Sequence, residues 1–242
     1  MQSKKYFLEK EVSVHMNIPI LHEDNHLLVI EKPINIPVQE DNSGDKDLLN
    51  LLKEDIKIRY EKPGNVYLGL VHRLDRPVGG VMVFAKTSKA ASRLSDVIRK
   101  DELDRKYLAI VRGIPKKKKA TLEHYLYKDT KKNKVYAVAA NHKEAKKAVL
   151  DYELISSEEG LSLLSVRLHT GRSHQIRVQL SESGLPLYGD QKYGQQVNRV
   201  GQQIALWANV LEFPHPTTKE LISIQSAPPK EYPWNLWPYY VK

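Results

Sequence analysis

The chain has 242 residues, 41% of them hydrophobic, and a formal net charge of +9 at pH 7. This apolar share suffices for a sizeable core and excludes a wholly disordered chain. The absence of cysteine excludes disulfides, cysteine-bound zinc, iron–sulfur clusters and thiol nucleophiles. The positive charge favours a polyanionic partner, with nucleic acid preferred to an anionic membrane surface.

The sequence also lacks the signals of a membrane or secreted protein. No apolar run approaches the roughly 18 residues that a membrane-spanning helix needs. The first 15 residues mix lysines with glutamates and have no apolar signal core. We therefore expect a soluble, cytoplasmic protein.

The first elements in chain order are a short strand and a helix. Residues 26–30 form a predicted buried strand that stops at Pro33, and residues 40–47 form a polar loop. Apolar spacing over residues 48–58 predicts a helix, which Pro-Gly at 63–64 ends.

The next segment places an acidic residue at the end of a predicted strand. Residues 68–74 read as a strand that delivers Asp75, and residues 77–80 force a turn into a second strand at 80–85. Ser88 is expected to cap a following helix, because apolar residues recur behind it at helical spacing.

Strand-like segments dominate the rest of the chain: residues 106–112, 135–140, 148–155, 161–168, 204–213 and 221–226. Ser173 is expected to cap a helix that runs through Leu180 and closes at Gly184. The Pro- and Trp-rich tail is expected to pack against the body. Without regular βαβ alternation, these elements predict an α+β fold with a largely antiparallel sheet.

Several common chemistries have no motif in the sequence. There is no Gly-rich dinucleotide motif or P-loop, no Gly-x-Ser-x-Gly elbow and no His-Glu-x-x-His pattern. These absences argue against a zinc hydrolase, and we therefore expect a reaction that needs no cofactor.

Three polar clusters are candidates for chemistry. Asp75 follows Arg73 and precedes Arg76, and this positive field favours an ionised carboxylate that can act as a base or nucleophile. By itself, however, Asp75 also suits a turn residue. The segment 171–177 (GRSHQIR) gathers donors that suit a phosphate, although viewed alone it is better explained as an ordinary capped helix with a solvated face. Tyr107, among basic residues, suits stacking on a base or plain packing.

The order of these clusters along the chain, together with the segments between them, is more informative than any one cluster. The segments are HRLD at 72–75, GGVMVFAK at 79–86, KYLAIVRG at 106–113, GRSHQIR at 171–177, Gly-Asp at 189–190 and Tyr-Gly at 193–194. Together they resemble the RluA family of RNA pseudouridine synthases, from about residue 22 to residue 226. The resemblance implies a mixed, mostly antiparallel central sheet bent around a basic catalytic cleft, with helices on the outside. It also implies isomerisation of uridine to pseudouridine in structured RNA, ribosomal or transfer RNA, without cofactor or metal.

The same resemblance implies a role for each site residue. Asp75 is the expected catalytic carboxylate, and Arg177 is its expected ion-pair partner. Tyr107 would stack on the target base, while Ile176 would form an apolar wall beside it. Arg73 would fill the gap that the uridine leaves when it flips out of the RNA. Asp75 could attack the ribose carbon or abstract a ribose proton, and the sequence does not separate these routes.

Two departures from the family pattern are visible. Where the family commonly has Thr-Ser-Gly, this chain has Val-Gly-Gly at 78–80. We expect the loss of a hydroxyl hydrogen bond and added flexibility at Gly79, but a tolerated change. Many relatives also carry a small basic RNA-binding domain ahead of the catalytic one. We expect a single catalytic domain over residues 1–242, without such a domain, in which the lysine-rich residues 116–147 select the RNA.

Two alternatives compete with an active, monomeric synthase. One is a catalytically idle RNA-binding or ribosome-assembly protein of the same fold, which the glycine at position 79 favours and the retention of Asp75, Tyr107 and Arg177 opposes. The other is an aspartate-dependent hydrolase of nucleosides, which would not need so basic a surface.

Overall fold

The central feature of the molecule is a sheet of 11 strands, seen in a computed structural model that describes residues 18–41 and 43–240. Residues 1–17, where no signal core is expected, lie outside the described part. The strands are β1 Ile20–Glu23, β2 Leu27–Lys32, β3 Gly69–Leu70, β4 Gly79–Ala85, β5 Asp104–Arg112, β6 Lys119–Asp129, β7 Lys134–Val138, β8 Lys146–Glu158, β9 Leu161–Leu168, β10 Leu206–Pro214 and β11 Leu221–Gln225. The helices are α1 Leu48–Arg59, α2 Ser88–Arg99, α3 Gln175–Glu182 and the short 3-10 helix η1 Trp234–Leu236.

The strands are paired in the order β1-β2-β4-β10-β5-β9-β8-β6-β7, with β3 beside β4 and β11 beside β10. Among the described strands only β4 and β10 are parallel, through Trp207 with Gly79 and Ala208 with Gly80. This confirms the predicted α+β class with a mixed, mostly antiparallel sheet.

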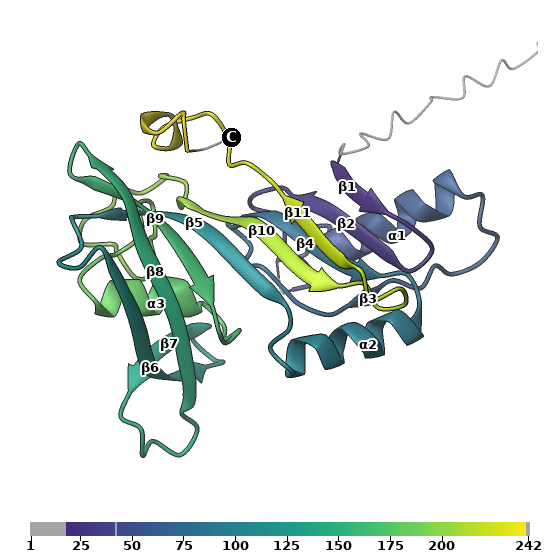
Figure 1. Ribbon diagram of the computed structural model, residues 1–242, viewed down its shortest axis with the longest axis horizontal. Helices are drawn as coiled ribbons and strands as arrows, with labels where there is room; N and C mark the ends of the chain where they lie inside the picture. Colours follow the sequence, from purple (N-terminus) through teal and green to yellow (C-terminus); the bar gives the residue numbers. More distant parts are fainter. Residues whose placement is uncertain (1–17, 42, 241–242) are drawn as a thin grey trace, which may run out of the picture.

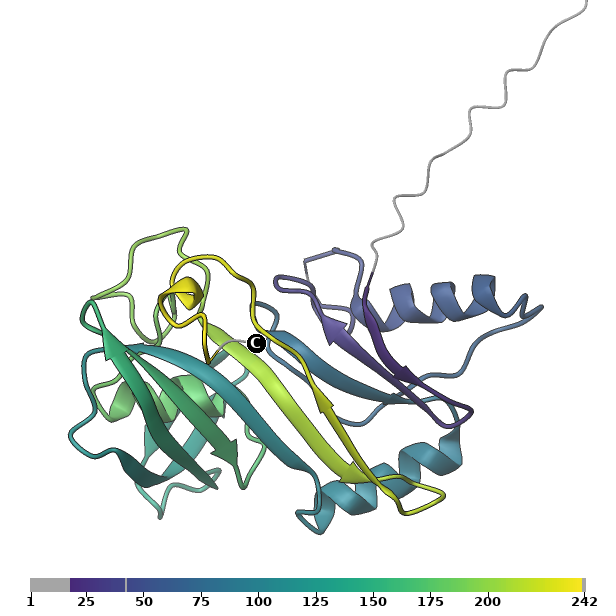
Figure 2. The same ribbon diagram turned by 45° about the horizontal axis from the view of Figure 1, so that its top comes forward.

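The sheet has two ends with helices beside each. Helices α1 and α2 lie beside β1–β4, and α3 lies beside β6–β9, as the two views in Figures 1 and 2 show. One hydrophobic cluster contains residues of both ends, among them Ile30 in β2, Val166 in β9 and Leu180 in α3. The two ends are therefore held together by a shared core.

The helices form where apolar spacing predicts them, and α1 begins at Leu48 as predicted, but the caps of α2 and α3 differ from the prediction. Helix α1 buries Leu48, Leu52 and Ile56 at helical spacing. Helix α2 is capped by Thr87, whose side chain accepts from the Ala90 amide at 3.1 Å, so the prediction of Ser88 as the cap is wrong by one residue. Thr87 has the extended backbone of a cap, whereas Ser88 is the first helical residue.

Helix α3 starts in a different way from the predicted Ser173 cap. His174 is the residue before its first turn, and its backbone is left-handed with φ 51°. No side chain caps this helix. The helix also runs two residues beyond Leu180, to Glu182, before Gly184 turns the chain with φ 75°.

The predicted strand over residues 68–74 is mostly wrong, because only Gly69 and Leu70 pair with β4. Beyond them the side chain of His72 takes the place of the backbone, since its Nε2 accepts from the Val83 amide of β4 at 3.1 Å. Burial lowers the pKa of His72 to about 4, which keeps this nitrogen available as an acceptor. The chain then leaves the sheet and carries Asp75 on an irregular segment.

The other strand predictions are confirmed to within a few residues. Strands β8 and β9 join at residues 159–160, where both residues have positive φ as a two-residue hairpin turn requires. The tail packs on the body as expected, because Trp234 and Trp237 are buried beside Tyr188 and Trp207.

Candidate functional site

A cleft of about 910 Å³ is lined by two of the polar segments singled out in the sequence, HRLD at 72–75 and GRSHQIR at 171–177. Residues 37–41 and 70–76 line it from one end of the sheet, and residues 168–177 line it from the other. Seven Lys and Arg residues line the cleft against four Asp and Glu residues. The predicted basic cleft is therefore present, and all five predicted site residues line it.

Asp75 sits on a tight turn at the entrance to β4. The Val78 amide donates to the Asp75 carbonyl at 2.9 Å, which closes the turn. The carboxylate itself is 24% exposed and faces the cleft. It is therefore fixed by its backbone but open to a substrate.

The side chain of Lys32 stabilises this turn by hydrogen bonds to its backbone carbonyl groups. Its side chain is fully buried, and Nζ donates to the carbonyls of Pro33, Arg76 and Val78 at 2.8, 3.0 and 2.8 Å. Three acceptors match the three N–H groups of an ammonium. Burial lowers the pKa of Lys32 to about 7, although the negative charge of Asp75 acts in the opposite direction and favours the protonated lysine.

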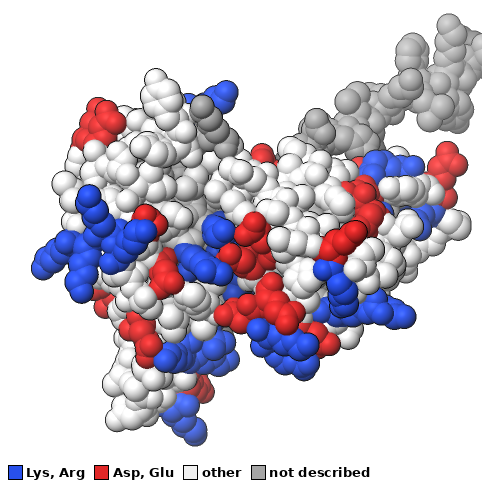
Figure 3. All heavy atoms as spheres, viewed as in Figure 1, with Lys and Arg blue, Asp and Glu red and all other residues white. Residues whose placement is uncertain are grey.

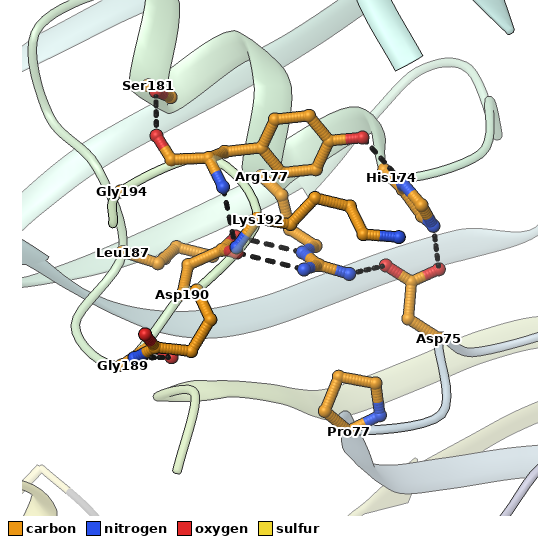
Figure 4. A network of polar contacts seen from close by, with 12 residues as sticks. Asp75, Pro77, His174, Arg177, Ser181, Leu187, Gly189, Asp190, Lys192 and Gly194 are labelled. Carbon is orange, nitrogen blue, oxygen red and sulfur yellow. Dashed lines mark hydrogen bonds and ion pairs between the residues drawn. The ribbon is translucent and has the colours of Figure 1, made fainter. Parts of the chain in front are cut away.

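Arg177 on α3 is the ion-pair partner of Asp75 across 102 residues of sequence. Its Nη1 donates to Asp75 Oδ2 at 3.0 Å (Figure 4). Its Nε and Nη2 donate to Asp190 Oδ2 and Oδ1, respectively, at 2.9 Å each. A bidentate Asp190 contact fixes the plane of the guanidinium. Asp190 therefore aims the remaining N–H groups of Arg177 at Asp75.

The charges of this network favour its ionised state. Burial disfavours the guanidinium, but the hydrogen bonds and charge of Asp190, followed by those of Asp75, raise the pKa of Arg177. Burial likewise opposes the charged form of Asp190, but Arg177 and the amides of Lys192 and Tyr193 hold its pKa below the usual range. The pair consequently stays charged at neutral pH.

The arginines adjacent to Asp75 in the sequence do not pair with it. Arg73 is exposed and donates to the Gln39 side chain at 3.2 Å. Arg76 contacts Asp45 and lies 3.9 Å from Asp41. Of the two arginines expected to flank Asp75 with positive charge, Arg73 therefore bonds a neutral amide and Arg76 pairs with other carboxylates. Arg177 supplies the ion pair with Asp75 instead.

Tyr107 and Ile176 form the buried wall of the cleft. Tyr107 on β5 is 8% exposed, and Ile176 on α3 is 4% exposed. Burial raises the pKa of Tyr107 to about 12, with Arg105 opposing and Asp75 reinforcing the shift. The tyrosine hydroxyl thus keeps its proton at neutral pH.

Gly79 is tightly packed, so the flexibility expected there is wrong. A Cβ atom at Gly79 would lie 2.3 Å from Trp207 Cζ3 and 3.0 Å from the Lys32 carbonyl oxygen. At Gly80, where φ is 114°, it would lie 2.2 Å from the Ala208 carbonyl oxygen. The two glycines allow β10 to approach β4 closely, and the indole of Trp207 fills the space of a serine side chain.

The lysine-rich residues 116–147 do not form one surface. Lys128 and the β6–β7 turn reach the cleft, where Asn133 is a lining residue. The exposed lysines 116–119 lie at the opposite end of β6, about 33 Å away along an 11-residue strand. On the face in Figure 3, Lys and Arg side chains alternate with Asp and Glu.

Four residues of the site were not predicted: Lys32, Asp190, His174 and Tyr193. Asp190 and Tyr193 lie in the Gly-Asp and Tyr-Gly segments that helped to reveal the resemblance, and His174 lies in GRSHQIR. The position of these three residues in the quoted segments was the sequence signal that could have identified them as site residues. A lysine followed by proline at the end of a predicted strand gave no comparable signal for Lys32.

The described residues hold no group of three or more His, Asp or Glu side chains that could bind a metal ion. None of the helices within residues 18–41 and 43–240 is long and apolar enough to cross a membrane.

A partly exposed carboxylate that is paired with a buried arginine in a basic cleft is an arrangement that could perform acid–base or nucleophilic chemistry on a polyanion. Comparison with known proteins specifies the class. The model of the family described as RNA pseudouridylate synthase matches residues 26–182. The chain belongs to this family, whose members are isomerases.

Individual relatives agree with this assignment. The uncharacterized RNA pseudouridine synthase YhcT of Bacillus subtilis is 36% identical over 88% of this chain and 70% of its own length. The ribosomal large subunit pseudouridine synthase D of Haemophilus ducreyi is 32% identical over 93% and 72%. Among solved structures, human RNA pseudouridylate synthase domain containing 4 has a TM-score of 0.75 at 25% identity, covering 90% of this chain and 91% of that one.

Proposed function

We propose that this protein isomerises specific uridines of structured RNA to pseudouridine, with Asp75 as the essential carboxylate. The observation that carries the proposal is the ion pair of Asp75 and Arg177 in a chain that belongs to the family. Ribosomal RNA is the favoured substrate, because several relatives are named ribosomal large subunit pseudouridine synthases. Transfer RNA remains the second candidate.

The reaction requires a nucleotide outside the base stack. The bond between C1′ and N1 breaks, the uracil turns, and a bond between C1′ and C5 forms while a proton leaves C5 and N1 gains one. These atoms are inaccessible in a stacked helix, so the nucleotide must flip out, at a cost of a few kcal/mol. Arg73, exposed at the rim, is suited to fill the gap.

Each lining residue then has a part in holding the base. Tyr107 would stack on the uracil, and Ile176 would close the other apolar side so that the detached base does not escape. Attack on C1′ and abstraction of a ribose proton both need ionised Asp75, which Arg177 stabilises by a charge-assisted hydrogen bond. We further propose that the chain works as one catalytic domain, as a monomer, in the cytoplasm and without cofactor.

Asp75→Asn tests the proposal, since it removes the charge and keeps the shape. The substrate is bulk RNA from cells that lack the protein, labelled with tritium at uridine C5, and turnover is tritium release. We expect release to stop while binding of the same RNA persists. Asp101→Asn is the matched control, because Asp101 also lines the cleft and its positive φ suits asparagine.

Continued tritium release by Asp75→Asn would refute the assigned role. No release by the unsubstituted chain, together with intact RNA binding, would favour the idle RNA-binding alternative. Gly79 no longer supports that alternative, because the indole of Trp207 occupies the space that a side chain at position 79 would need.

A further inference from the structure

His174 has an unusual backbone and an unusual environment. Its left-handed φ of 51° is uncommon for a residue other than glycine, although histidine, like Asn and Asp, adopts it more often than most side chains do. In place of capping α3, its imidazole lies between Tyr193 and Asp75, and only 10% of the side chain is exposed (Figure 4). A left-handed backbone at the edge of the cleft, together with an imidazole buried between two polar partners, points to a functional role for the side chain.

The hydrogen bonds around Tyr193 determine which ring nitrogen of His174 carries the proton. The Val135 amide donates to the Tyr193 hydroxyl oxygen at 2.9 Å, and His174 Nδ1 lies 2.6 Å from the same oxygen. Among the described residues no other hydrogen-bond partner of this hydroxyl is seen, so its own proton points to Nδ1. Nδ1 is then an acceptor, and the proton of a neutral imidazole resides on Nε2.

Tyr193 is itself firmly placed. Its amide donates to Asp190 Oδ1 at 3.2 Å, and its carbonyl accepts from the Ser181 hydroxyl at 2.6 Å. The guanidinium of Arg177 lies 5.2 Å from the centre of its ring. The same network that aims Arg177 therefore also fixes the hydroxyl that faces His174.

His174 is neutral and faces the oxygen of Asp75 that Arg177 leaves free. Burial, with the charges of Arg177, Lys192 and Lys128, lowers the pKa of His174 to about 4 despite the opposing charge of Asp75. Its Nε2 lies 4.0 Å from Asp75 Oδ1, whereas Arg177 bonds Oδ2. A gap of this size closes with a small movement, as hydrogen bonds of catalytic groups often do when substrate binds.

We propose that His174, held by Tyr193 as the tautomer protonated at Nε2, is a positioning residue that donates to Asp75 Oδ1 in the RNA complex. Arg177 would then donate a charge-assisted hydrogen bond to Asp75 Oδ2, and His174 would donate a neutral N–H to Asp75 Oδ1. A neutral donor orients the carboxylate without adding a second cation. This inference rests on the proposed function, but its first test does not.

The first test reads the tautomer directly in the RNA-free protein. Long-range ¹H–¹⁵N correlation spectra between pH 6 and 8 distinguish a protonated ring nitrogen from an unprotonated one, and His174→Gly identifies the signals. We expect Nδ1 unprotonated and Nε2 protonated over this range. In Tyr193→Phe the tautomers should mix. A protonated Nδ1 in the unsubstituted protein overturns the proposal and leaves the proposed function intact.

The second test separates positioning from folding by tritium release from the labelled bulk RNA. His174→Gly relieves the left-handed φ, so the fold should be as stable as before or more so. We expect kcat to fall by about 10- to 100-fold with little change in KM, as for one lost hydrogen bond to a charged group. Tyr193→Phe should lower kcat in the same way, and the double variant should lose little more than His174→Gly.

Tyr188→Phe is the matched control, because Tyr188 also loses a hydroxyl contact, from Gln202 at 2.9 Å, but does not line the cleft. An unchanged kcat in His174→Gly, or an effect confined to KM, overturns the positioning role. Fully additive losses in the double variant overturn the link through Tyr193. Absence of tritium release by the unsubstituted chain would instead contradict the proposed function.

Discussion

The contact of Gly79 with Trp207 makes a quantitative prediction about the strand that carries Asp75. In Gly79→Ala the new methyl group would meet two indole carbons at 2.3 and 2.8 Å and the Lys32 carbonyl oxygen at 3.0 Å. The indole cannot swing away freely, because it is buried and its Nε1 donates to the Ser226 hydroxyl at 3.1 Å. Strand β4 must therefore shift or the indole must leave its site.

The expected cost follows from overpacking in a dense core. Inserting one methyl group into a packed interior costs about 1–3 kcal/mol of unfolding free energy. With a urea dependence of roughly 3 kcal/mol/M, the unfolding midpoint should fall by about 0.3–1 M. Because β4 begins four residues after Asp75, turnover should also fall, whereas a purely distant defect would leave it unchanged.

Equilibrium urea unfolding followed by circular dichroism measures this cost. Gly64→Ala is the matched control, since a Cβ atom there meets nothing within 4 Å and should change the midpoint little. In Gly79→Ala/Trp207→Leu the clash is removed, so the double variant should be more stable than the sum of the single effects. A midpoint for Gly79→Ala equal to that of the control would show that the packing argument is wrong.

Three further predictions concern the site and its surface. Asp190→Asn should lower the free energy of unfolding by about 3–5 kcal/mol, because it leaves Arg177 buried with a weakened partner; a loss below 1 kcal/mol in urea unfolding would argue against that role. The folded pKa of Lys32 is about 7, below its value of about 10.4 in the unfolded chain, so its burial penalty is full below pH 7 and is relieved as pH rises to 10. The stability of the unsubstituted protein should therefore rise relative to Lys32→Met by up to about 1.4 kcal/mol per pH unit in this window, and parallel curves would exclude the shift. Replacing the lysines of the 131–134 turn with glutamine should reduce the salt slope of RNA binding by about one unit per lost phosphate contact, more than replacing lysines 116–119, and the reverse ranking would place the RNA at the far end of β6.

The sequence by itself determined the features that depend on local backbone preference. The apolar spacing of Leu48, Leu52 and Ile56 predicted α1, and the strand predicted over residues 161–168 is β9 with the same bounds. The order of short motifs identified the family and with it Asp75 and Arg177. Such signals are readable because each one extends over few residues.

The tertiary structure decided which side chains meet. Arg177 contacts Asp75 from 102 residues away, whereas Arg73 and Arg76, its neighbours in sequence, turn to other partners. Tyr193 faces His174, and Trp207 fills the space beside Gly79. These contacts depend on how distant strands and helices pack, and periodicity along the chain carries no information about that packing.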